Sequence, residues 1–476
     1  MTKTLLDVSP DHYIGGKRVA SDAKFETRDP YTGEVLLEVS RAGAAEVDMA
    51  VQAAHDAFPA WAALGPVGRA AHIHRLADAI DANIERLATV ECADMAMLLR
   101  SLRARVIARG ALNYRNYADL AVAYEERDWR SKGTWNRVQR MPAGPAAVIT
   151  PWNAPFMLST WKTAPALAAG CTVVLKPAEW SPLSCSILAE LADEAGIPPG
   201  VFNVVQGIGE EAGAALVSHP LIRRVSFTGS TDTARFIGQA AAKNVVPFTA
   251  ELGGKNPFLV FADADLDAAA KKAAGQYDDA GQVCLSGTRL LIEESVLDEF
   301  LERFNAATDA HVLGDPRDDA TTVSPLIHPD HLARVEGFVQ RAEGRIVRGG
   351  RRGEGNFYEP TLIEPTSNDD EIVQNEVFGP VLTYQTFSTE QEAVALANST
   401  KYGLSAILYT GSLGRADRVG RQLRGGTVWV NTFLVRDLTA PFGGMGASGI
   451  GREGGDYALD FYSDLKTLQI LEGTVS

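Results

Sequence analysis

Cysteine is scarce in this sequence, and no long apolar segment is present. Of 476 residues only four are cysteine (Cys92, Cys171, Cys185 and Cys284), and no two of them form a Cys-x-x-Cys pair. Four are too few for a disulfide framework, so we expect a reducing compartment, the cytoplasm. No window reaches the roughly 18 apolar residues that a membrane span requires, and the first residues lack a signal-peptide pattern. We therefore expect no membrane partner.

Positive charge is also in deficit. Lysine and arginine total 45 against 60 aspartates and glutamates, a formal net charge of −15. Nucleic acids and anionic membranes bind basic surfaces, so neither is expected as a partner. A small anionic substrate remains compatible, because local arginines can override the global charge. The closest histidines, His72 and His74, have no cysteine or carboxylate cluster nearby, so we expect no metal site.

Short apolar segments alternate with helical ones through most of the chain. A single core rarely grows past roughly 250–300 residues, so a chain of this length predicts two or three domains. Apolar spacings of three and four predict helices over 44–120. After that, the alternation predicts two α/β units with parallel sheets. In the first unit we expect strands within 146–150, 172–177, 201–205 and 225–228, and helices at 162–169, 184–195, 211–217 and 233–243. In the second we expect strands at 258–261, 290–292 and 406–409, and helices at 296–308 and 392–398.

Two segments do not fit either unit. Residues 124–140 are polar and aromatic without a helical face, which indicates an excursion from the body. Residues 459–470 alternate like an exposed strand. An apolar edge strand is prone to pair with another chain unless something covers it. We therefore infer that this tail pairs with a neighbouring subunit, in a homodimer or homotetramer.

One cysteine lies in a setting suited to covalent chemistry. Cys284 ends the run Asp279-Ala280-Gly281-Gln282-Val283-Cys284, and Glu251 opens Glu251-Leu252-Gly253-Gly254-Lys255. A thiol among small residues can attack a carbonyl, and a carboxylate can activate the water that releases the product. The other three cysteines, in helical or strand patterns, are interpreted as small buried apolar residues.

Two strand ends are candidates for holding a nucleotide. Phe227-Thr228-Gly229-Ser230 ends a strand and opens a helix, where backbone amides and the Ser230 hydroxyl can meet a phosphate. An ordinary strand–helix turn is the alternative. Lys176 and Glu179 also follow a buried strand, the end at which α/β sheets bind ligands. Glu179 can accept hydrogen bonds from a ribose and would repel a 2′-phosphate, which favours NAD over NADP; a surface Lys–Glu pair is the alternative.

Seven segments together carry a family resemblance. From about residue 10 to 470 the chain resembles the aldehyde dehydrogenase superfamily, the NAD(P)-dependent type with a catalytic cysteine. The resemblance implies a Rossmann-like NAD-binding domain (1–123 and 142–252), an α/β catalytic domain (253–445) and a small β oligomerisation arm (124–141 and 456–476). The segments are Thr150-Pro151-Trp152-Asn153, Lys176-Pro177-Ala178-Glu179, Phe227-Thr228-Gly229-Ser230, Glu251-Leu252-Gly253-Gly254-Lys255, Gly281-Gln282-Val283-Cys284, Glu376-Val377-Phe378-Gly379-Pro380 and Pro441-Phe442-Gly443-Gly444.

The resemblance also implies roles for individual residues. Cys284 would form a thiohemiacetal whose oxyanion is held by the Asn153 amide and the Cys284 backbone N–H. Hydride transfer to NAD⁺ would leave a thioester, and Glu251 would activate water to release the acid. Lys162 and Glu453 match a proton-relay pair behind Glu251. The implied cofactor-binding residues are Thr150, Trp152, Lys176, Glu179, Gly229, Ser230, Glu376 and Phe378.

The substrate is indicated by one arginine-containing loop. Arg436-Asp437-Leu438, shortly before Phe442, is similar to dehydrogenases for hydroxymuconate and aminomuconate semialdehydes. A guanidinium can hold a carboxylate through two parallel hydrogen bonds. We expect Arg436, together with Arg109, to bind the far carboxylate of a semialdehyde from aromatic ring cleavage, and Phe442 to line the aldehyde tunnel. The alternative for Arg436 is a surface pair with Asp437.

Other functions remain open from the sequence. A benzaldehyde-type aromatic aldehyde could be the substrate. A CoA-acylating dehydrogenase would have no use for Glu251, and an ester hydrolase would leave Glu179, Ser230 and Glu376 idle. A non-catalytic protein on the same fold would not need Cys284, Glu251 and Asn153 together.

Overall fold

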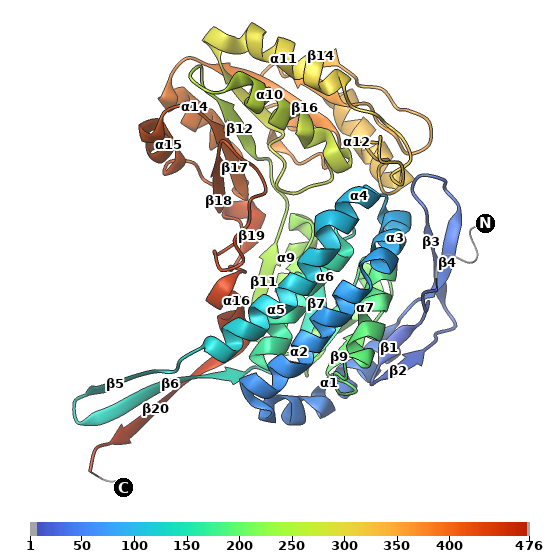
Figure 1. The fold of residues 1–476 in the computed structure, drawn as a ribbon, viewed down its shortest axis with the longest axis vertical. Helices are drawn as coiled ribbons and strands as arrows, with labels where there is room; N and C mark the ends of the chain where they lie inside the picture. Colours follow the sequence, from blue (N-terminus) through green and yellow to red (C-terminus); the bar gives the residue numbers. More distant parts are fainter. Residues whose placement is uncertain (1–6, 474–476) are drawn as a thin grey trace.

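The computed structural model describes residues 7–473. Two sheets flanked by helices form the body, and a three-stranded arm projects from it (Figure 1). The predicted α/β fold is confirmed. Residues 1–6 of the expected cofactor domain and 474–476 of the expected arm lie outside the described residues.

The first sheet is built around five parallel strands. These strands are buried on both faces, which is why they read as short apolar runs without alternation. Antiparallel strands β1, β2 and β19 extend the two edges. The sheet order is β19 (Gly449–Ile450), β11 (Phe248–Glu251), β10 (Arg224–Thr228), β7 (Ala146–Ile149), β8 (Val173–Lys176), β9 (Phe202–Val204), β1 (His12–Ile14) and β2 (Lys17–Val19).

Helices cover both faces of this sheet. The region 44–120 is helical as predicted, although it divides into several helices and a π-helical turn, η2 (Leu102–Val106). The helix expected at 162–169 is longer, because Pro155 starts it about two turns earlier, at a position where proline costs no hydrogen bond. The helices are α1 (Ala44–Ala63), α2 (Gly65–Ala82), α3 (Ile84–Met95), α4 (Leu99–Ser101), α5 (Ile107–Ala123), α6 (Pro155–Ala169), α7 (Leu183–Glu194), η3 (Gly209–Gly213), α8 (Ala214–Ser218) and α9 (Thr231–Lys243).

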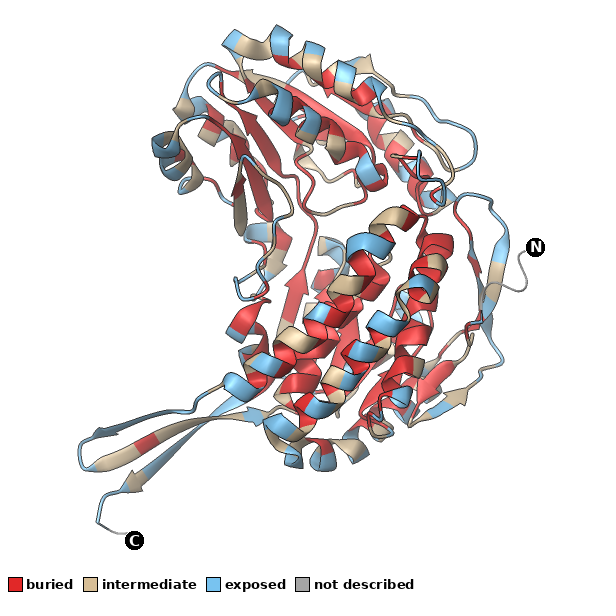
Figure 2. Cartoon of the chain, viewed as in Figure 1, coloured by how far each residue is buried: buried red, intermediate tan, exposed pale blue. Residues whose placement is uncertain are grey.

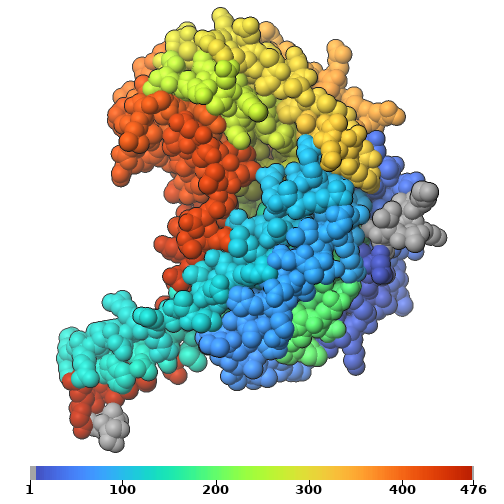
Figure 3. All heavy atoms as spheres, in the orientation of Figure 1, coloured from blue at the N-terminus to red at the C-terminus, as the bar shows by residue number. Residues whose placement is uncertain are grey.

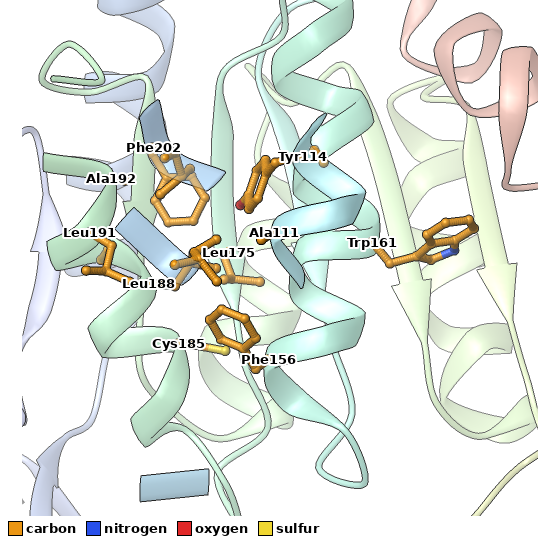
Figure 4. Packing of buried hydrophobic residues seen from close by; sticks show 14 of the residues in the cluster. Ala111, Tyr114, Phe156, Trp161, Leu175, Cys185, Leu188, Leu191, Ala192 and Phe202 are labelled. Carbon is orange, nitrogen blue, oxygen red and sulfur yellow. The ribbon is translucent and has the colours of Figure 1, made fainter. Parts of the chain in front are cut away.

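A glycine brings α5 and α6 into close contact. A Cβ at Gly110 of α5 would lie 2.4 Å from the Phe156 ring of α6, so only glycine fits there. Phe156 belongs to the apolar core shown in Figure 4, whereas Trp161, on the same helix, points away from the labelled core residues. This packing places Arg109, next to Gly110, on the side that Trp161 faces.

The second sheet is mostly parallel, and its strands come from 257–430. Figure 2 shows its strands, like those of the first sheet, buried beneath helices. The sheet order is β14 (Arg345–Arg348), β15 (Thr361–Glu364), β16 (Val381–Phe387), β13 (Arg289–Glu293), β12 (Pro257–Val260), β17 (Ser405–Tyr409) and β18 (Thr427–Val430). The helical segments of this half are α10 (Leu266–Ala274), η4 (Gly275–Gly281), η5 (Glu294–Val296), α11 (Leu297–Asp309), α12 (Pro329–Arg341), α13 (Glu371–Gln374), α14 (Glu390–Ala397) and α15 (Leu413–Gly420).

The arm confirms one prediction and corrects another. The excursion over 124–140 is a hairpin, β5 (Arg127–Ser131) and β6 (Thr134–Pro142), that projects from the body (Figure 3). The expected strand over 459–470 is wrong at its start. Leu459 lies in α16 (Gly455–Phe461) because its side chain is buried in the main core, and the strand β20 (Ser463–Leu471) begins only afterwards. β20 pairs with β6 of the same chain and is the outer strand of the arm.

Three smaller features complete the fold. β3 (Lys24–Arg28) and β4 (Val35–Ser40) form a separate hairpin, and η6 (Gly446–Ser448) precedes β19. Within 7–473 no helix combines the length and apolar character that crossing a membrane would demand.

Candidate active site

Four of the predicted site segments meet at one edge of the first sheet. Thr150 follows β7, Lys176 ends β8, Gly229 follows β10 and Glu251 ends β11. The strands are parallel and in register, with Thr228 opposite Glu251 on neighbouring strands. Carboxyl ends of parallel strands lie along a single edge, which is where α/β sheets bind ligands. Motifs that are far apart in the sequence therefore lie close together in space.

The loop that carries Cys284 enters this edge from the second half of the chain. Asp279 and Ala280 have φ values of +52° and +54°, and Gly281 has +67°. A Cβ at Gly281 would lie 2.3 Å from the carbonyl oxygen of Gly379, so glycine lets the loop pack against the 376–380 segment. Cys284 is half-buried, whereas the other three cysteines are fully buried, as predicted.

Asn153 faces the Cys284 loop. Its Nδ2 donates to the carbonyl of Gln282 at 2.9 Å, two residues before Cys284. This contact joins the loop after β7 to the loop after η4, which are 129 residues apart along the chain. The side-chain amide is thus beside the loop that carries the thiol, near where an oxyanion donor is needed.

Glu251 is a buried carboxylate without a hydrogen-bond partner on either oxygen within the described residues. Gly443 leaves room for it, since a Cβ there would lie 2.8 Å from Oε1. Burial, and then the nearby Glu453, raise the pKa of Glu251 well above its usual value, while Lys162 acts in the opposite direction. A carboxyl group whose pKa is raised towards neutrality is suited to accept a proton from water.

Behind Glu251 lies a buried ion pair. Nζ of Lys162 donates to Oε1 of Glu453 and, at 3.2 Å, to the hydroxyl of Ser226. Glu453 is held in place by an antiparallel bridge to Phe442, with N–H···O distances of 2.6 and 2.7 Å. Such a chain of ionisable groups can carry a proton away from Glu251.

The groups expected to hold a nucleotide are arranged along the same edge. Nζ of Lys176 is 3.0 Å from Oε2 of Glu179, and the Glu179 carboxylate stays partly exposed. The Ser230 hydroxyl caps α9 by accepting from the N–H of Thr233 at 3.1 Å. Packing alone requires glycine at position 229, because a Cβ there would lie 2.4 Å from the ring of Phe227. The accessible carboxylate and the helix N-terminus fit a ribose and a pyrophosphate respectively.

Glu376 and Phe378 come from the loop between α13 and β16. Oε1 of Glu376 accepts from the N–H of Gly254 at 2.9 Å, and a Cβ at Gly253 would collide with Oε2. The Gly-Gly pair after Glu251 therefore leaves room for the Glu376 carboxylate. Burial raises the pKa of Glu376 to about 7. Phe378 has φ +61° and packs edge-on against Trp152, with ring centroids 5.3 Å apart.

Two arginines converge on one indole. Cζ of Arg436 is 5.1 Å from the Trp161 ring centroid and 3.8 Å from that of Phe442. Cζ of Arg109 is 5.7 Å from the Trp161 ring. Neither arginine forms an ion pair with any described carboxylate. Asp437 bonds to Thr439 instead, which rules out the predicted alternative of an Arg436–Asp437 pair in this structure.

The chain matches a family model described as "Aldehyde dehydrogenase family" over residues 18–468. The chain belongs to this family. It is 42% identical to the 2-hydroxymuconic semialdehyde dehydrogenase of Pseudomonas sp. (strain CF600), over 96% of this chain and 98% of that one. It is 40% identical to the 2-aminomuconic semialdehyde dehydrogenase of Danio rerio, over 99% and 100%. The crystal structure of betaine aldehyde dehydrogenase from Staphylococcus aureus in complex with NAD⁺ has a TM-score of 0.96 at 35% identity, covering 99% of this chain and 96% of that one.

The predicted family and enzyme class are thereby confirmed. The protein is an aldehyde dehydrogenase, an oxidoreductase that passes electrons from an aldehyde to a nicotinamide dinucleotide. The domain boundaries and the roles of single residues stay predictions.

Three residues of this aldehyde dehydrogenase site were not identified from the sequence. Trp161 is buried at the border of the main core, and its ring faces both arginines. His331 and Arg334 of α12 hydrogen-bond to the loop of Glu376 and Phe378. The sequence carries no signal for these contacts, because the helical pattern around 331–334 is that of any amphipathic helix.

The thiol of this dehydrogenase is expected to react slowly in the absence of cofactor. Burial, followed by the carboxylates of Glu376 and Glu251, raises the pKa of Cys284 to about 12. The thiolate is the reactive form, so alkylation by iodoacetamide should accelerate about tenfold per pH unit between about pH 7 and 9. Mass spectrometry of the Cys284 peptide measures the rate. A rate that is already at its plateau at pH 7 would contradict this expectation.

Proposed function

We propose that this aldehyde dehydrogenase oxidises a semialdehyde whose far end carries a carboxylate, using NAD⁺. The observation that carries the proposal is the pair of guanidiniums on Trp161, without a carboxylate partner among the described residues. Burial, and then the neighbouring Arg436, lower the pKa of Arg109 to about 10. Two adjacent, partly buried cations are stabilised when an anion lies between them. The names of the two semialdehyde dehydrogenase relatives support the same substrate class.

The proposed reaction uses three groups around the thiol. Cys284 Sγ adds to the aldehyde carbon, and the thiohemiacetal oxyanion accepts from Asn153 Nδ2 and from the backbone N–H of Cys284. The hydrogen bond from Asn153 to the carbonyl of Gln282 supports this role, because it holds the amide against the Cys284 loop. When bound, NAD⁺ accepts the hydride that leaves this carbon. Glu251 then removes a proton from the water that opens the resulting thioester, and Lys162 and Glu453 pass that proton on.

We further propose NAD rather than NADP, a cytoplasmic location and a homodimer or homotetramer. The Glu179 carboxylate, positioned by Lys176, would repel a 2′-phosphate. Four free thiols are typical of a reducing compartment. The arm ends in β20, an outer strand with Leu465, Leu468 and Leu471 exposed, which suits strand pairing with a second copy.

Removal of one guanidinium should separate substrate classes. In Arg436→Gln, kcat/KM for a carboxylated semialdehyde should fall about 30- to 300-fold, since a buried charge-assisted pair is lost. The value for benzaldehyde should change less than about threefold, because that substrate has no carboxylate for the arginine to bind. Reduced nicotinamide is followed with NAD⁺ and with NADP⁺, with and without CoA.

The matched control is Arg421→Gln, which removes the same charge at an exposed position paired with Asp417. It should leave kcat/KM for both substrates unchanged. Equal losses for both aldehydes in Arg436→Gln would refute the carboxylate anchor, and benzaldehyde as the preferred wild-type substrate would establish the aromatic alternative. A requirement for CoA would establish that the enzyme is a CoA-acylating dehydrogenase.

A further inference from the structure

Helix α12 begins against the cofactor side of the molecule. His328, the residue before α12, stacks on Trp180 with ring centroids 4.7 Å apart and planes inclined by 7°. One turn later His331 meets Trp152 at 5.1 Å. Trp180 directly follows Glu179, and Trp152 directly precedes Asn153. The start of α12, which belongs to the second half of the chain (Figure 1), is therefore docked on two loops that follow strands of the first sheet.

The same helix holds the loop of Glu376 by its backbone. Nε2 of His331 donates to the carbonyl of Phe378 at 2.7 Å. The guanidinium of Arg334 donates to the carbonyls of Val377 and, at 2.8 Å, of Glu376. Residues three apart on a helix share one face. Three consecutive carbonyls are thus bound by one face of α12.

The protonation state of His331 suits this contact. Burial lowers its pKa to about 4, so the imidazole is neutral at physiological pH and has a single N–H. Since the carbonyl of Phe378 can only accept, that N–H must be on Nε2. The hydrogen bond therefore fixes the tautomer.

The loop held in this way would not keep its shape unaided. Phe378 has φ +61°, a left-handed conformation that non-glycine residues rarely adopt without outside support. From the side chains, the Glu376 carboxylate rests on Gly253 and Gly254, and the Phe378 ring packs against Trp152. The carbonyl bonds from α12 supply the remaining constraint.

We propose that His331 and Arg334 are positioning residues that set the 376–378 loop in register with the cofactor-binding edge of the first sheet. The inference rests on the proposed function, in which Glu376 and Phe378 face the nicotinamide half of the cofactor. α12 links that loop to Trp152 and Trp180, and therefore to the loops that carry Asn153 and Glu179. Loss of either donor lets the loop relax, which weakens contacts to the nicotinamide riboside while leaving the adenosine side intact.

The test compares two nucleotides in His331→Phe and Arg334→Gln. Both variants should bind NADH about tenfold more weakly, equivalent to one good hydrogen-bonded contact. ADP, which lacks the nicotinamide riboside, should bind as it does to the wild type. KM for NAD⁺ should rise in parallel, while KM for the aldehyde stays unchanged. His331→Gln retains an N–H donor and should restore most of the NADH affinity.

The control is Arg341→Gln on the same helix, where the exposed guanidinium bonds to Glu371. Its NADH affinity should equal that of the wild type, and thermal unfolding shows whether each variant is folded. Equal weakening of NADH and ADP, or NADH affinity within about twofold of wild type in both variants, would overturn the positioning role. Failure of the proposed function is distinguishable, because it would appear in the wild type, as a preference for NADP⁺ or for an aldehyde without a carboxylate, whereas failure of the positioning role appears only in the comparison of the variants with the wild type.

Discussion

Replacing Cys284 by alanine is expected to abolish aldehyde oxidation, with kcat reduced by at least about 10⁴-fold. Without the sulfur no thiohemiacetal forms, and the hydride would have to leave a hydrated aldehyde that nothing holds. The backbone N–H of residue 284 and the Asn153 amide remain, so binding of NADH should be unchanged. Formation of reduced nicotinamide and a fluorescence titration with NADH measure the two quantities on one preparation.

The matched control is Cys92→Ala. Cys92 is buried in α3, and burial raises the pKa of its thiol to about 12. This variant should lose some stability through the cavity it creates, about 1 kcal/mol or more, yet keep full kcat. Substantial aldehyde oxidation in Cys284→Ala would mean that the chemistry does not pass through a thioester, and the proposed mechanism would be wrong.

Replacing Glu251 by glutamine should uncouple the two halves of the reaction. Hydride transfer precedes the attack of water, so one equivalent of NADH per active site should still form in a burst. Steady-state turnover should then fall by about 10²- to 10⁴-fold, the contribution of a general base. Stopped-flow absorbance resolves the burst, and mass spectrometry of quenched enzyme should detect the acyl adduct on Cys284.

The pH dependence of the wild type follows from the same carboxylate. Glu251 must be deprotonated to act as a base, and its pKa is raised by burial and by Glu453. Turnover limited by hydrolysis should therefore rise with pH through that raised pKa, and Glu251→Gln should abolish this dependence. Glu376→Gln is the control variant at a second carboxylate. It should raise KM for NAD⁺, and its reaction should show no burst of NADH. Unchanged steady-state turnover in Glu251→Gln would exclude it as the base.

The residues at the sheet edge were predictable because their signals are local. Glu251 ends an apolar run and is followed by Gly253 and Gly254, a pattern read directly as a strand and a turn. Ser230 begins a helix after a strand, and the structure makes it the cap of α9. Strands alternating with helices imply a parallel sheet, and the carboxyl ends of its strands necessarily share one edge. Motifs far apart in sequence could therefore be assigned to one site.

Local pattern failed where burial contradicted it. Residues 459–462 alternate like a strand, yet Leu459 and Tyr462 are buried around the end of α16. The same four residues fit a helical turn once a core lies beside them, and the sequence does not say what lies beside them. Propensity is a weak constraint that tertiary packing overrides.

By itself the sequence predicted the first sheet and its ligand-binding edge, and it singled out Cys284 and Glu251 as the candidate reactive pair, because strand ends, turns and helix caps are read from neighbouring residues. The resemblance predicted that Arg436 and Arg109 act together, but only the tertiary structure decided that both lie on the ring of Trp161. They come from α5, α6 and the loop after β18, and their meeting depends on contacts such as that between Gly110 and Phe156. Packing between distant elements leaves no periodic trace along the chain, so the residues at the sheet edge could be predicted in advance and the contacts of both arginines with Trp161 could not.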